Sequence, residues 1–490
     1  MKANPHIYSR KLIQKSELKT FETIDSYEIM KKAAKNSFDY IFKNFQFQKI
    51  LIICGPGNNG GDGIIIAKHF IDKKKTVTIF APLGIGKTPD STKALNELKD
   101  NNIIKEKINF DEYDLIVDSL FGVGFNKTLS KELYNFFYII NNLKTYIISI
   151  DMPSGVYTDS GQISSIAIKA DTTLTFHRLK PGLLLMPGKK YAGNIEILDI
   201  SLINLDNESK IHLLKPPLLK KTDVNEHKYS RGTTFIIAGR QLIGASKLAA
   251  LAASQASLRV GAGVSKIFVR ETDVNFFKPH ILEEMIIPYK NTNHLISIIQ
   301  KTNISSLIYG CGTDDVKVNR KILQFLLKQS FRIVLDASAF SLMKHDKDIF
   351  FNLLSNREAV TILTPHKGEF ERIFSHNNNK LEASIEASKK TNSIILYKGN
   401  DTVITSPKGD IFINYYSSPY LATSGSGDVL AGMIGSFLSQ QYNGLEATLL
   451  ACYIHSQCGI NLNKGLIASD LIKEIPNVLK KLNKMEASDS

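Results

Sequence analysis

The sequence has no tryptophan, few cysteines and no long apolar run, and each absence excludes a class of protein. Its four cysteines, at positions 54, 311, 452 and 458, lack CxxC spacing, so neither a zinc site nor a disulfide framework is expected. No segment approaches the ~20 consecutive apolar residues that a membrane-spanning helix needs. The basic N-terminus is not followed by the apolar run of a secretory signal. We therefore expect a cytoplasmic protein without a membrane partner.

The composition is typical of a folded protein with a surplus of positive charge. Of the 490 residues, 43% are hydrophobic and 22% are charged, which argues against extensive disorder. At roughly 150 residues per domain, the length suggests about three domains or two large ones. The net charge of +14 favours anionic partners. The lysines are dispersed, whereas nucleic-acid-binding proteins usually cluster them, so we expect no nucleic-acid partner.

Short apolar runs alternate with amphipathic segments in two separate stretches of the chain. This pattern predicts parallel sheets covered by helices on both faces. In the first stretch, which ends near Leu205, the predicted strands are 49–54, 76–80, 114–118 and 145–150, and the predicted helices are 64–73 and 88–99. In the second stretch, the predicted strands are 234–238, 265–269, 306–309, 332–336, 359–364 and 393–397, and the predicted helices are 244–260 and 427–440.

Between the two stretches lies a polar segment that contains Pro216 and Pro217. Adjacent prolines favour extended backbone and prevent helix formation, which is typical of a linker. The predicted boundaries are therefore a first domain at 1–210, a linker at 211–230 and a second domain at 231–490. The two halves share no motif, so the chain is predicted to be a fusion of two different α/β domains.

A glycine-rich run, GPGNNGGDG at 55–63, follows the first predicted strand and opens a helix. Ligands of open parallel sheets bind beyond the carboxyl ends of the strands, where glycines let the backbone approach them closely. The run is not GxGxxG and lacks the lysine of a Walker A loop. A tight turn with Asp62 as a helix N-cap is the alternative, but nine residues of this composition favour a binding loop.

Two more polar clusters follow strands of the same predicted sheet. Asp118 is followed by FGVGFNKT at 121–128, and Asp151 is followed by Met152, Pro153 and Ser154. Because the strand ends meet at one sheet edge, these clusters and the glycine run are expected to form one pocket. The oxygens of Asn59, Asp118 and Ser154 suit a weakly held cation. Lys127 suits an anionic group, and Asp151 is the candidate for proton transfer.

GPGNNGGDG, VDSLFGVGFNK and IDMPSG, in this order, resemble the epimerase domain of the NAD(P)H-hydrate repair enzymes. The resemblance implies a Rossmann-like domain that interconverts the R and S epimers of hydrated NADH and NADPH and binds potassium through Asn59, Asp118 and Ser154. Asp151 would be catalytic. The implied substrate contacts are Asn58, Asn59, Gly60, Gly61, Asp62, Gly122, Val123, Gly124, Phe125, Asn126, Lys127, Thr128 and Asp151. Upstream, Ala34 replaces a glycine that the family usually has.

The second half contains ATSGSGDVLAG at 422–432, where a glycine turn opens a helix. Such a turn forms a nest of N–H donors for phosphate. Asp428 would there accept the proton of a hydroxyl that attacks the phosphate. With GxGD alone, an acid that merely stabilises the helix is an equally good explanation. KGNDT at 398–402, TPHKGE at 364–369 and two glycines around Cys311 also follow predicted strands, and this favours the binding site.

HKYSRG, TPHKGE, KGNDT and GSGDVLAG resemble the ADP-dependent dehydratase domain of the same family, which has a ribokinase-like fold. The resemblance implies a catalytic Asp428, a dinucleotide site that includes Ala245, Gly312, His366 and Asp428, and a magnesium ion that accompanies ADP. The implied nucleotide contacts are Lys398, Gly399, Asn400, Asp401, Thr402 and Gly427. Ser424, Cys311 and Lys367 replace a glycine and two prolines of the family pattern.

The implied function is metabolite repair by an isomerase and a lyase on one chain. Phosphorylation by ADP would turn the hydroxyl at C6 of the hydrated ring into a phosphate, which the ring nitrogen can expel, leaving NAD(P)H, AMP and phosphate. We also expect a homo-oligomer. The main alternative is a ribokinase-like small-molecule kinase fused to a dinucleotide-binding module, because GxGD helices occur in such kinases. A non-enzymatic RNA-associated protein is a further alternative that the dispersed lysines disfavour.

Overall fold

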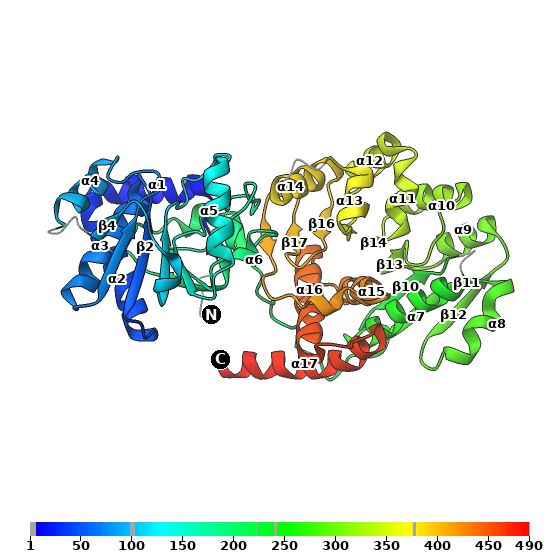
Figure 1. Ribbon diagram of the computed structural model, residues 1–490. Helices are drawn as coiled ribbons and strands as arrows, with labels where there is room; N and C mark the ends of the chain where they lie inside the picture. Colours follow the sequence, from blue (N-terminus) through cyan, green and yellow to red (C-terminus); the bar gives the residue numbers. More distant parts are fainter. Residues whose placement is uncertain (1–5, 99–102, 222, 240–242, 376–378, 490) are drawn as a thin grey trace. The chain divides into compact units, whose positions relative to one another are not determined.

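The computed structural model describes residues 6–98, 103–221, 223–239, 243–375 and 379–489 (Figure 1). The chain forms two compact units, Met1–His212 and Leu213–Ser490. Within the described residues, no helix is both long enough and apolar enough to cross a membrane. The four cysteines are buried free thiols.

The first unit is built on a parallel sheet. Its strands are β2 (Lys49–Cys54), β3 (Thr76–Phe80), β4 (Ile104–Lys105), β5 (Leu115–Ser119), β6 (Tyr146–Ile150), β7 (Thr172–Phe176) and β8 (Asn194–Leu198). They lie in the order β4-β3-β2-β5-β6-β7-β8, and every neighbouring pair is parallel. A short strand β1 (His6–Ile7) pairs antiparallel with β9 (Ile211–Leu213).

Helices cover both faces of this sheet because side chains along a strand point alternately to opposite faces. The helices are α1 (Arg10–Phe21), α2 (Ser26–Asn44), α3 (Asn58–Asp72), α4 (Pro89–Asn96), α5 (Lys131–Asn141) and α6 (Lys189–Ala192). Ile50 and Ile52 of β2 pack with α2 and α3 in one cluster. Leu51 and Ile53 pack with α5 in another. The apolar run of β2 is therefore buried on both sides.

The second unit also contains a mostly parallel sheet. Its strands are β10 (Thr233–Ile237), β11 (Val264–Arg270), β12 (Met285–Tyr289), β13 (Ser306–Tyr309), β14 (Arg332–Leu335), β15 (Thr361–Leu363), β16 (Ile394–Tyr397), β17 (Val403–Thr405) and β18 (Ile411–Ile413). They lie in the order β18-β17-β16-β15-β14-β13-β10-β11-β12. β17 and β18 are antiparallel to their neighbours, and the other strands are parallel.

Two layers of helices enclose this second sheet (Figure 1). One layer contains α7 (Ile243–Arg259), α15 (Ser426–Ser439), α16 (Gly444–Leu462) and α17 (Ala468–Asp489), and short α8 (Val274–Phe277) lies at its edge. The opposite layer contains α9 (Thr292–Lys301), α10 (Lys317–Leu327), α11 (Ser338–Lys344), α12 (Lys347–Ser355), α13 (Lys367–Ile373) and α14 (Lys380–Thr391). Both units are thus α/β folds with helices on both faces of a sheet, as the sequence predicts.

The glycine run differs from the predicted loop, because α3 already begins at Asn58. The reason is close packing. A Cβ at Gly60 would lie 1.8 Å from the carbonyl oxygen of Gly55, and one at Gly63 would lie 2.9 Å from Cys54 Sγ. These glycines let the first turns of α3 lie directly against the end of β2. Apart from residue 222, which is not described, residues 214–232 form neither helix nor strand.

Two candidate active sites

A cavity of about 730 Å³ lies at the carboxyl ends of β2, β5 and β6 in the first unit. It is lined by Asn58, Asn59, Asp62, Gly122, Val123, Gly124, Phe125, Asn126, Lys127, Thr128 and Asp151 among others. Gly60 and Gly61, which were predicted to contact the ligand, are buried and do not line the cavity. The three polar clusters that follow β2, β5 and β6 are therefore brought together.

Asp151 is fixed at this cavity by a buried ion pair. It is 7% exposed and its backbone has φ +66°, a conformation that costs energy in a residue other than glycine. Its Oδ1 accepts a hydrogen bond from Lys180 Nζ at 2.7 Å, and its Oδ2 accepts one from the Val123 N–H at 3.1 Å. Lys180 is itself 1% exposed. The carboxylate thus has a fixed orientation and a neutralising charge.

Two further acids line the cavity beside Asp151. Glu17 projects from α1, and Asp62 lies in the second turn of α3. Burial, followed by the charge of Asp151, raises the pKa of Glu17 to about 7, although Lys180 offsets part of this effect. Burial and the same neighbouring acids raise the pKa of Asp62 well above its ordinary value. Of these three acids, Asp151 alone is paired with a buried lysine among the described residues.

Asp118 and Ser154 form a hydrogen-bonded cluster at the ends of β5 and β6 but do not line the cavity. Asp118 is fully buried and accepts hydrogen bonds from Ser154 Oγ at 2.6 Å, Ser154 N–H at 2.9 Å and Ser149 Oγ at 2.8 Å. Burial raises its pKa, and these hydrogen bonds offset part of the shift. Among the described residues, no cation pairs with Asp118. Asn59 Nδ2 is buried and has no hydrogen-bond partner in the described part of the chain.

The second unit has a cavity of about 490 Å³ beyond β16 and at the start of α15. It is lined by His366, Lys398, Gly399, Asn400, Thr402, Ser426, Gly427 and His455 among others. Asp401 is buried behind this lining, where its carboxylate pairs with Lys380 Nζ at 2.6 Å. Gly312 and Asp428 are not part of the lining. Ala245 lies in α7, but its side chain is outside the described part of the structure.

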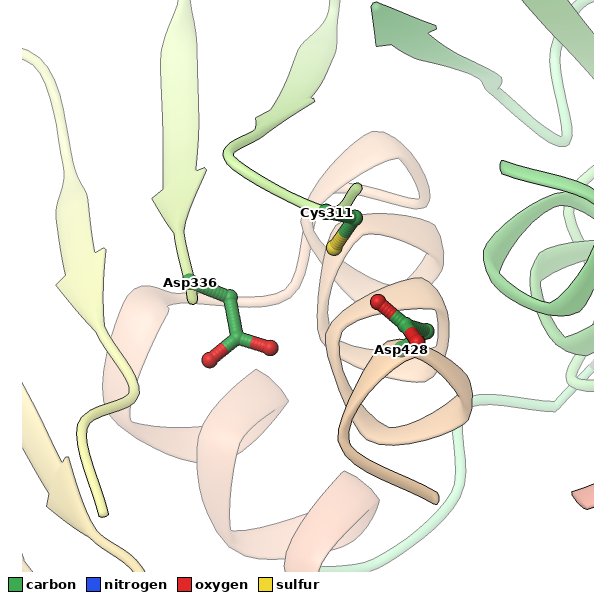
Figure 2. A group of neighbouring side chains, drawn as sticks. All are labelled: Cys311, Asp336 and Asp428. Carbon is green, nitrogen blue, oxygen red and sulfur yellow. The ribbon is translucent and has the colours of Figure 1, made fainter. Parts of the chain in front are cut away.

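Cys311, Asp336 and Asp428 form a cluster next to this cavity (Figure 2). Cys311 follows β13, Asp336 follows β14, and Asp428 lies in the first turn of α15. One ligand atom from each lies within 4.8 Å of the others. Burial, followed by the charge of Asp336, raises the pKa of Asp428 to about 6. Burial and the two acids also raise the pKa of the Cys311 thiol well above its ordinary value.

Lys398 connects the cluster to the cavity. Its Nζ lies 2.7 Å from Asp336 Oδ1 and 3.7 Å from Glu369 Oε2. Burial lowers the pKa of Lys398, but these two acids outweigh it, and the net shift is upward. A Cβ at Gly427 would lie 3.3 Å from Lys398 Nζ and 3.4 Å from Asp336 Oδ2. Gly427 therefore keeps the helix start close to the charged pair.

Two histidines of this site have identifiable structural roles. His366 is the N-cap of α13, where its Nδ1 accepts the N–H of Gly368 at 3.0 Å. His455 lies against the start of α15, with Nε2 2.9 Å from Ser426 Oγ. Burial lowers the pKa of His455 to about 4, so its ring is neutral at physiological pH. Both rings line the cavity, which places them within reach of a ligand as well.

Five residues of these sites were not identified from the sequence. They are Glu17, Lys180, Asp336, Lys380 and His455. Asp336 had a usable signal, because it closes a predicted strand as Asp118 and Asp151 do. Lys180 precedes Pro181 and Gly182, a weak turn signal. The others lie on helices, where charged residues are common.

Of the replaced family residues, only Cys311 lies inside the cluster. Ser424 is exposed. Lys367 is also exposed and lies 3.8 Å from Glu371. These two replacements therefore change the surface rather than the site.

Comparisons with known proteins match both halves of the chain. The family model described as YjeF-related protein N-terminus matches residues 26–182, and the model described as NAD(P)H-hydrate dehydratase matches residues 234–480. A solved structure of ADP/ATP-dependent NAD(P)H-hydrate dehydratase from Bacillus subtilis, co-crystallised with ATP and Mg²⁺, is 26% identical. That match covers 54% of this chain and 95% of the other, with a TM-score of 0.46.

The curated relatives match over nearly the whole length. The bifunctional NAD(P)H-hydrate repair enzyme Nnr of Dictyoglomus turgidum is 33% identical over 95% of this chain and 98% of its own length. The protein of the same name from Coxiella burnetii is 27% identical over 96% of this chain and 98% of its own length. The similarity thus includes both units in the same order, and the chain belongs to the family of bifunctional NAD(P)H-hydrate repair enzymes.

Proposed function

We propose that this protein repairs hydrated NADH and NADPH by two reactions at its two sites. The first unit interconverts the R and S epimers, and the second dehydrates the S epimer with ADP, releasing AMP and phosphate. The observation that carries the proposal is the 33% identity to a bifunctional repair enzyme over 95% of the chain. The geometry agrees with it, because each unit has a cavity beside an acid at the carboxyl end of its sheet.

In the first unit, Asp151 is the base of the epimerase reaction. Gly122–Thr128 line the cavity of about 730 Å³ and are proposed to contact the dinucleotide. Asp151 faces this space, while Lys180 lies behind it in the protein. A carboxylate held in this way is positioned to accept the proton of the C6 hydroxyl. The remaining donors of the cavity orient the nicotinamide ring.

Potassium binding is proposed for Asn59, Asp118 and Ser154. Asp118 is a buried carboxylate whose described partners are all neutral hydrogen-bond donors, so a cation would supply the missing charge. The Ser154 hydroxyl donates to Asp118 and accepts the Phe121 N–H at 2.9 Å, which leaves one lone pair of its oxygen for a cation. Asn59 can supply an oxygen ligand if its side-chain amide is rotated by half a turn, so that Oδ1 lies where the unpartnered Nδ2 lies now. A bound monovalent cation would fix the ends of β5 and β6, and with them the cavity wall.

In the second unit, Asp428 is the base of the phosphoryl-transfer step. It takes the proton of the C6 hydroxyl as that oxygen attacks the β-phosphorus of ADP, and AMP leaves. The N–H groups at the start of α15 and the Lys398 ammonium stabilise the transferred charge. Gly425 makes this turn possible, because its φ of +84° strains any other residue. The C6–O bond then breaks, the ring nitrogen supplies electrons, and loss of a C5 proton gives NAD(P)H.

Magnesium is proposed to accompany the nucleotide at Asp336. Carboxylate oxygens suit Mg²⁺, whereas the Cys311 thiol does not. Asp336 is ion-paired with Lys398 at 2.7 Å, which leaves its second oxygen available. A magnesium ion there would neutralise phosphate charge during transfer. The residues proposed to contact the nucleotide line the cavity of the second unit. They are Lys398, Gly399, Asn400 and Thr402.

Location and assembly are further parts of the proposal. We place the protein in the cytoplasm as a homo-oligomer that acts on free dinucleotides, without nucleic-acid or membrane partners. Light scattering after size-exclusion chromatography tests the assembly, with a single-chain mass as the contradicting result. Salt-dependent RNA binding in the absence of turnover would instead favour a non-enzymatic role.

The function is tested with mixed epimers of hydrated NADH, incubated with and without ADP. Recovery of the reduced-nicotinamide absorbance only with ADP supports the proposal, and Asp428→Asn should abolish this recovery. Asp151→Ala should convert the S epimer and leave the R epimer unreacted. A stable phosphorylated alcohol, without recovery of NADH, would identify a small-molecule kinase instead.

A further inference from the structure

The epimerase cavity contains a carboxyl group for which the proposed reaction has no role so far. Glu17 lies in α1 and lines the cavity with Asp62 and Asp151. Among the described residues, no hydrogen bond or ion pair reaches its carboxylate, so it neither caps a helix nor holds two elements together. A partly buried acid without a structural partner indicates another role.

The position of Glu17 is fixed by the residues around it on the same helix. Ser16 and Thr20 are both fully buried. Ser16 Oγ donates to the carbonyl of Ile203, and Thr20 Oγ1 accepts the Ile203 N–H at 2.9 Å. These two contacts anchor the helical turn that carries Glu17 to one backbone segment of the unit. The carboxyl is therefore presented to the cavity by a fixed element.

The charges around the cavity are unbalanced. Lys180 uses all three of its N–H donors, on Asp151 Oδ1, Thr175 Oγ1 and the Phe176 carbonyl, at 2.7 to 2.8 Å. It is also not part of the lining, so it cannot exchange protons with a ligand directly. In the part of the chain that the structure describes, no lysine or arginine pairs with Glu17 or Asp62.

The other chargeable groups that line the cavity are Asp90 and Lys127. Asp90 is paired with Lys93 at 3.5 Å, and Lys127 is exposed. Neither neutralises Glu17. Because burial and Asp151 raise the pKa of Glu17 to about 7, both of its protonation states are accessible near neutral pH. A group poised in this way is suited to donate and accept protons in one catalytic cycle.

Epimerisation at C6 needs two proton-transfer groups. The substrate is a hemiaminal, in which C6 carries both a hydroxyl and the ring nitrogen N1. Ring opening converts it to an aldehyde when the C6–N1 bond breaks, its electron pair stays on N1, and the hydroxyl loses its proton. One group must accept that proton while another protonates N1. Rotation of the aldehyde and the reverse transfers then close the ring on the opposite face.

We propose that Glu17 is the second catalytic residue of the epimerase site and exchanges a proton with N1, while Asp151 exchanges one with the C6 oxygen. This inference rests on the epimerase function proposed above. In ring opening, Glu17 gives its proton to N1 and Asp151 receives the hydroxyl proton. In ring closure, N1 returns a proton to Glu17 and Asp151 returns one to oxygen. Protons and electrons balance over the cycle, and no co-reactant is needed.

Asp62 is less suited to this role. It lies deeper than Glu17, in the second turn of α3, and its pKa is raised well above the ordinary value. An upward shift disfavours release of the proton, which a group that exchanges protons in each cycle must accomplish. Asp62→Asn keeps a donor at that position and should therefore cost much less activity than a change at Glu17.

The test compares Glu17→Gln with Glu22→Gln in the full chain. Glu22 follows the same helix, is exposed and does not line the cavity, so it is a matched control. Both changes are made in an Asp428→Asn background, which silences the dehydratase reaction. Conversion of pure R epimer of hydrated NADH to the S epimer is followed by chromatography between pH 5.5 and 8.5.

We expect Glu17→Gln to lower the epimerase kcat about 100-fold or more, with KM within threefold of the parent, because general acid–base groups contribute about 10²- to 10⁴-fold. The parent kcat should fall above about pH 7, where Glu17 loses its proton, and the variant should lack this fall. Glu17→Asp should restore part of the rate. Glu22→Gln should match the parent throughout.

Three results overturn the role of Glu17 while the proposed function stands. They are a Glu17→Gln kcat within threefold of the parent, a raised KM with an unchanged kcat, or a decline above pH 7 that persists in the variant. A parent that does not epimerise at all overturns the proposed function and this inference together. Unfolding by urea, followed by circular dichroism, confirms that each variant is folded.

Discussion

Asp428→Asn should make the second unit more stable while it abolishes dehydration. Asp428 lies in a cluster with Cys311 and Asp336, without a lysine of its own, since the nearby Lys398 is paired with Asp336 at 2.7 Å. Burial and Asp336 raise its pKa from the ordinary 3.8 to about 6, although Cys311 and Lys398 offset part of the shift. The ionised Asp428 carboxylate therefore lowers the free energy of unfolding of the second unit, a loss of stability that is typical of functional sites.

The sign and size of this cost follow from the shift. Because the pKa is raised on folding, the folded state binds the proton more tightly, and stability falls as pH rises from about 4 to about 6. A difference of about two units between the pKa values of Asp428 in the folded and unfolded states corresponds to about 3 kcal/mol in the free energy of unfolding. The gain from Asp428→Asn should be about 3 kcal/mol at pH 8, about half of that at pH 5, and near zero below pH 4.

Hydrogen exchange on peptides from β13 and β14 measures this unit separately from the first. The metal-free and nucleotide-free protein is compared with Asp428→Asn and with Glu358→Gln, an exposed acid whose loss should matter by less than about 0.5 kcal/mol. If the Asn variant is no more stable than the parent at pH 8, or if its gain is the same at pH 5 and pH 8, the carboxylate is not a destabilising charge.

Three other outcomes are expected. Lys180→Met should lower the free energy of unfolding of the first unit by about 3–5 kcal/mol, because it leaves Asp151 buried without its cation. It should abolish epimerisation but not dehydration. Lys169→Met, at an exposed position, is the control, and a Lys180→Met variant that still epimerises would contradict the role of the ion pair. Lys380→Met should raise the KM for ADP about tenfold with kcat within threefold, because Asp401 loses its partner behind the nucleotide loop; an unchanged KM would exclude this support. Replacing potassium with a large organic cation should slow epimerisation several-fold and leave dehydration unchanged, and equal rates in both salts would remove the proposed ion.

Two of the strands that the sequence predicts with the right bounds, β2 and β13, are buried along almost their whole length, and a third, β3, is partly exposed on one face. The ranges of β2, β3 and β13 coincide with the predicted 49–54, 76–80 and 306–309. Other strands, among them β7, β8, β12 and β18, were not predicted. β7 reads TTLTF, and its threonines are buried although they are polar, because β7 lies inside the sheet between β6 and β8, which no local pattern reveals. β12 carries Pro288 and lies at a sheet edge, the position where proline is tolerated.

Site residues could be predicted where polar residues follow a predicted strand or where a glycine turn opens a helix. Asp118 and Asp151 were identifiable because each closes an apolar run, and the sheet then brings them to one edge. Glu17 lines the same cavity from a helix, and Lys180 contacts Asp151 from the segment after β7. Their positions depend on how the chain returns to the sheet, and a single charged residue on a helix is usually solvent-exposed.

The two acids proposed as catalytic, Asp151 and Asp428, differ in the cations placed beside them, and the difference fits the reactions proposed for them. Asp151 is paired directly with buried Lys180, which fixes the orientation of the carboxylate at the cavity. Among the described residues, Asp428 has no lysine partner, because Lys398 pairs with Asp336, which follows β14. A lysine paired with Asp428 would lower the basicity of its carboxylate, which must take the proton of a weakly nucleophilic hydroxyl during attack on the phosphate. At Asp336, the same ammonium can still face the transferred phosphoryl group, so the second unit retains both a strong base and a positive charge.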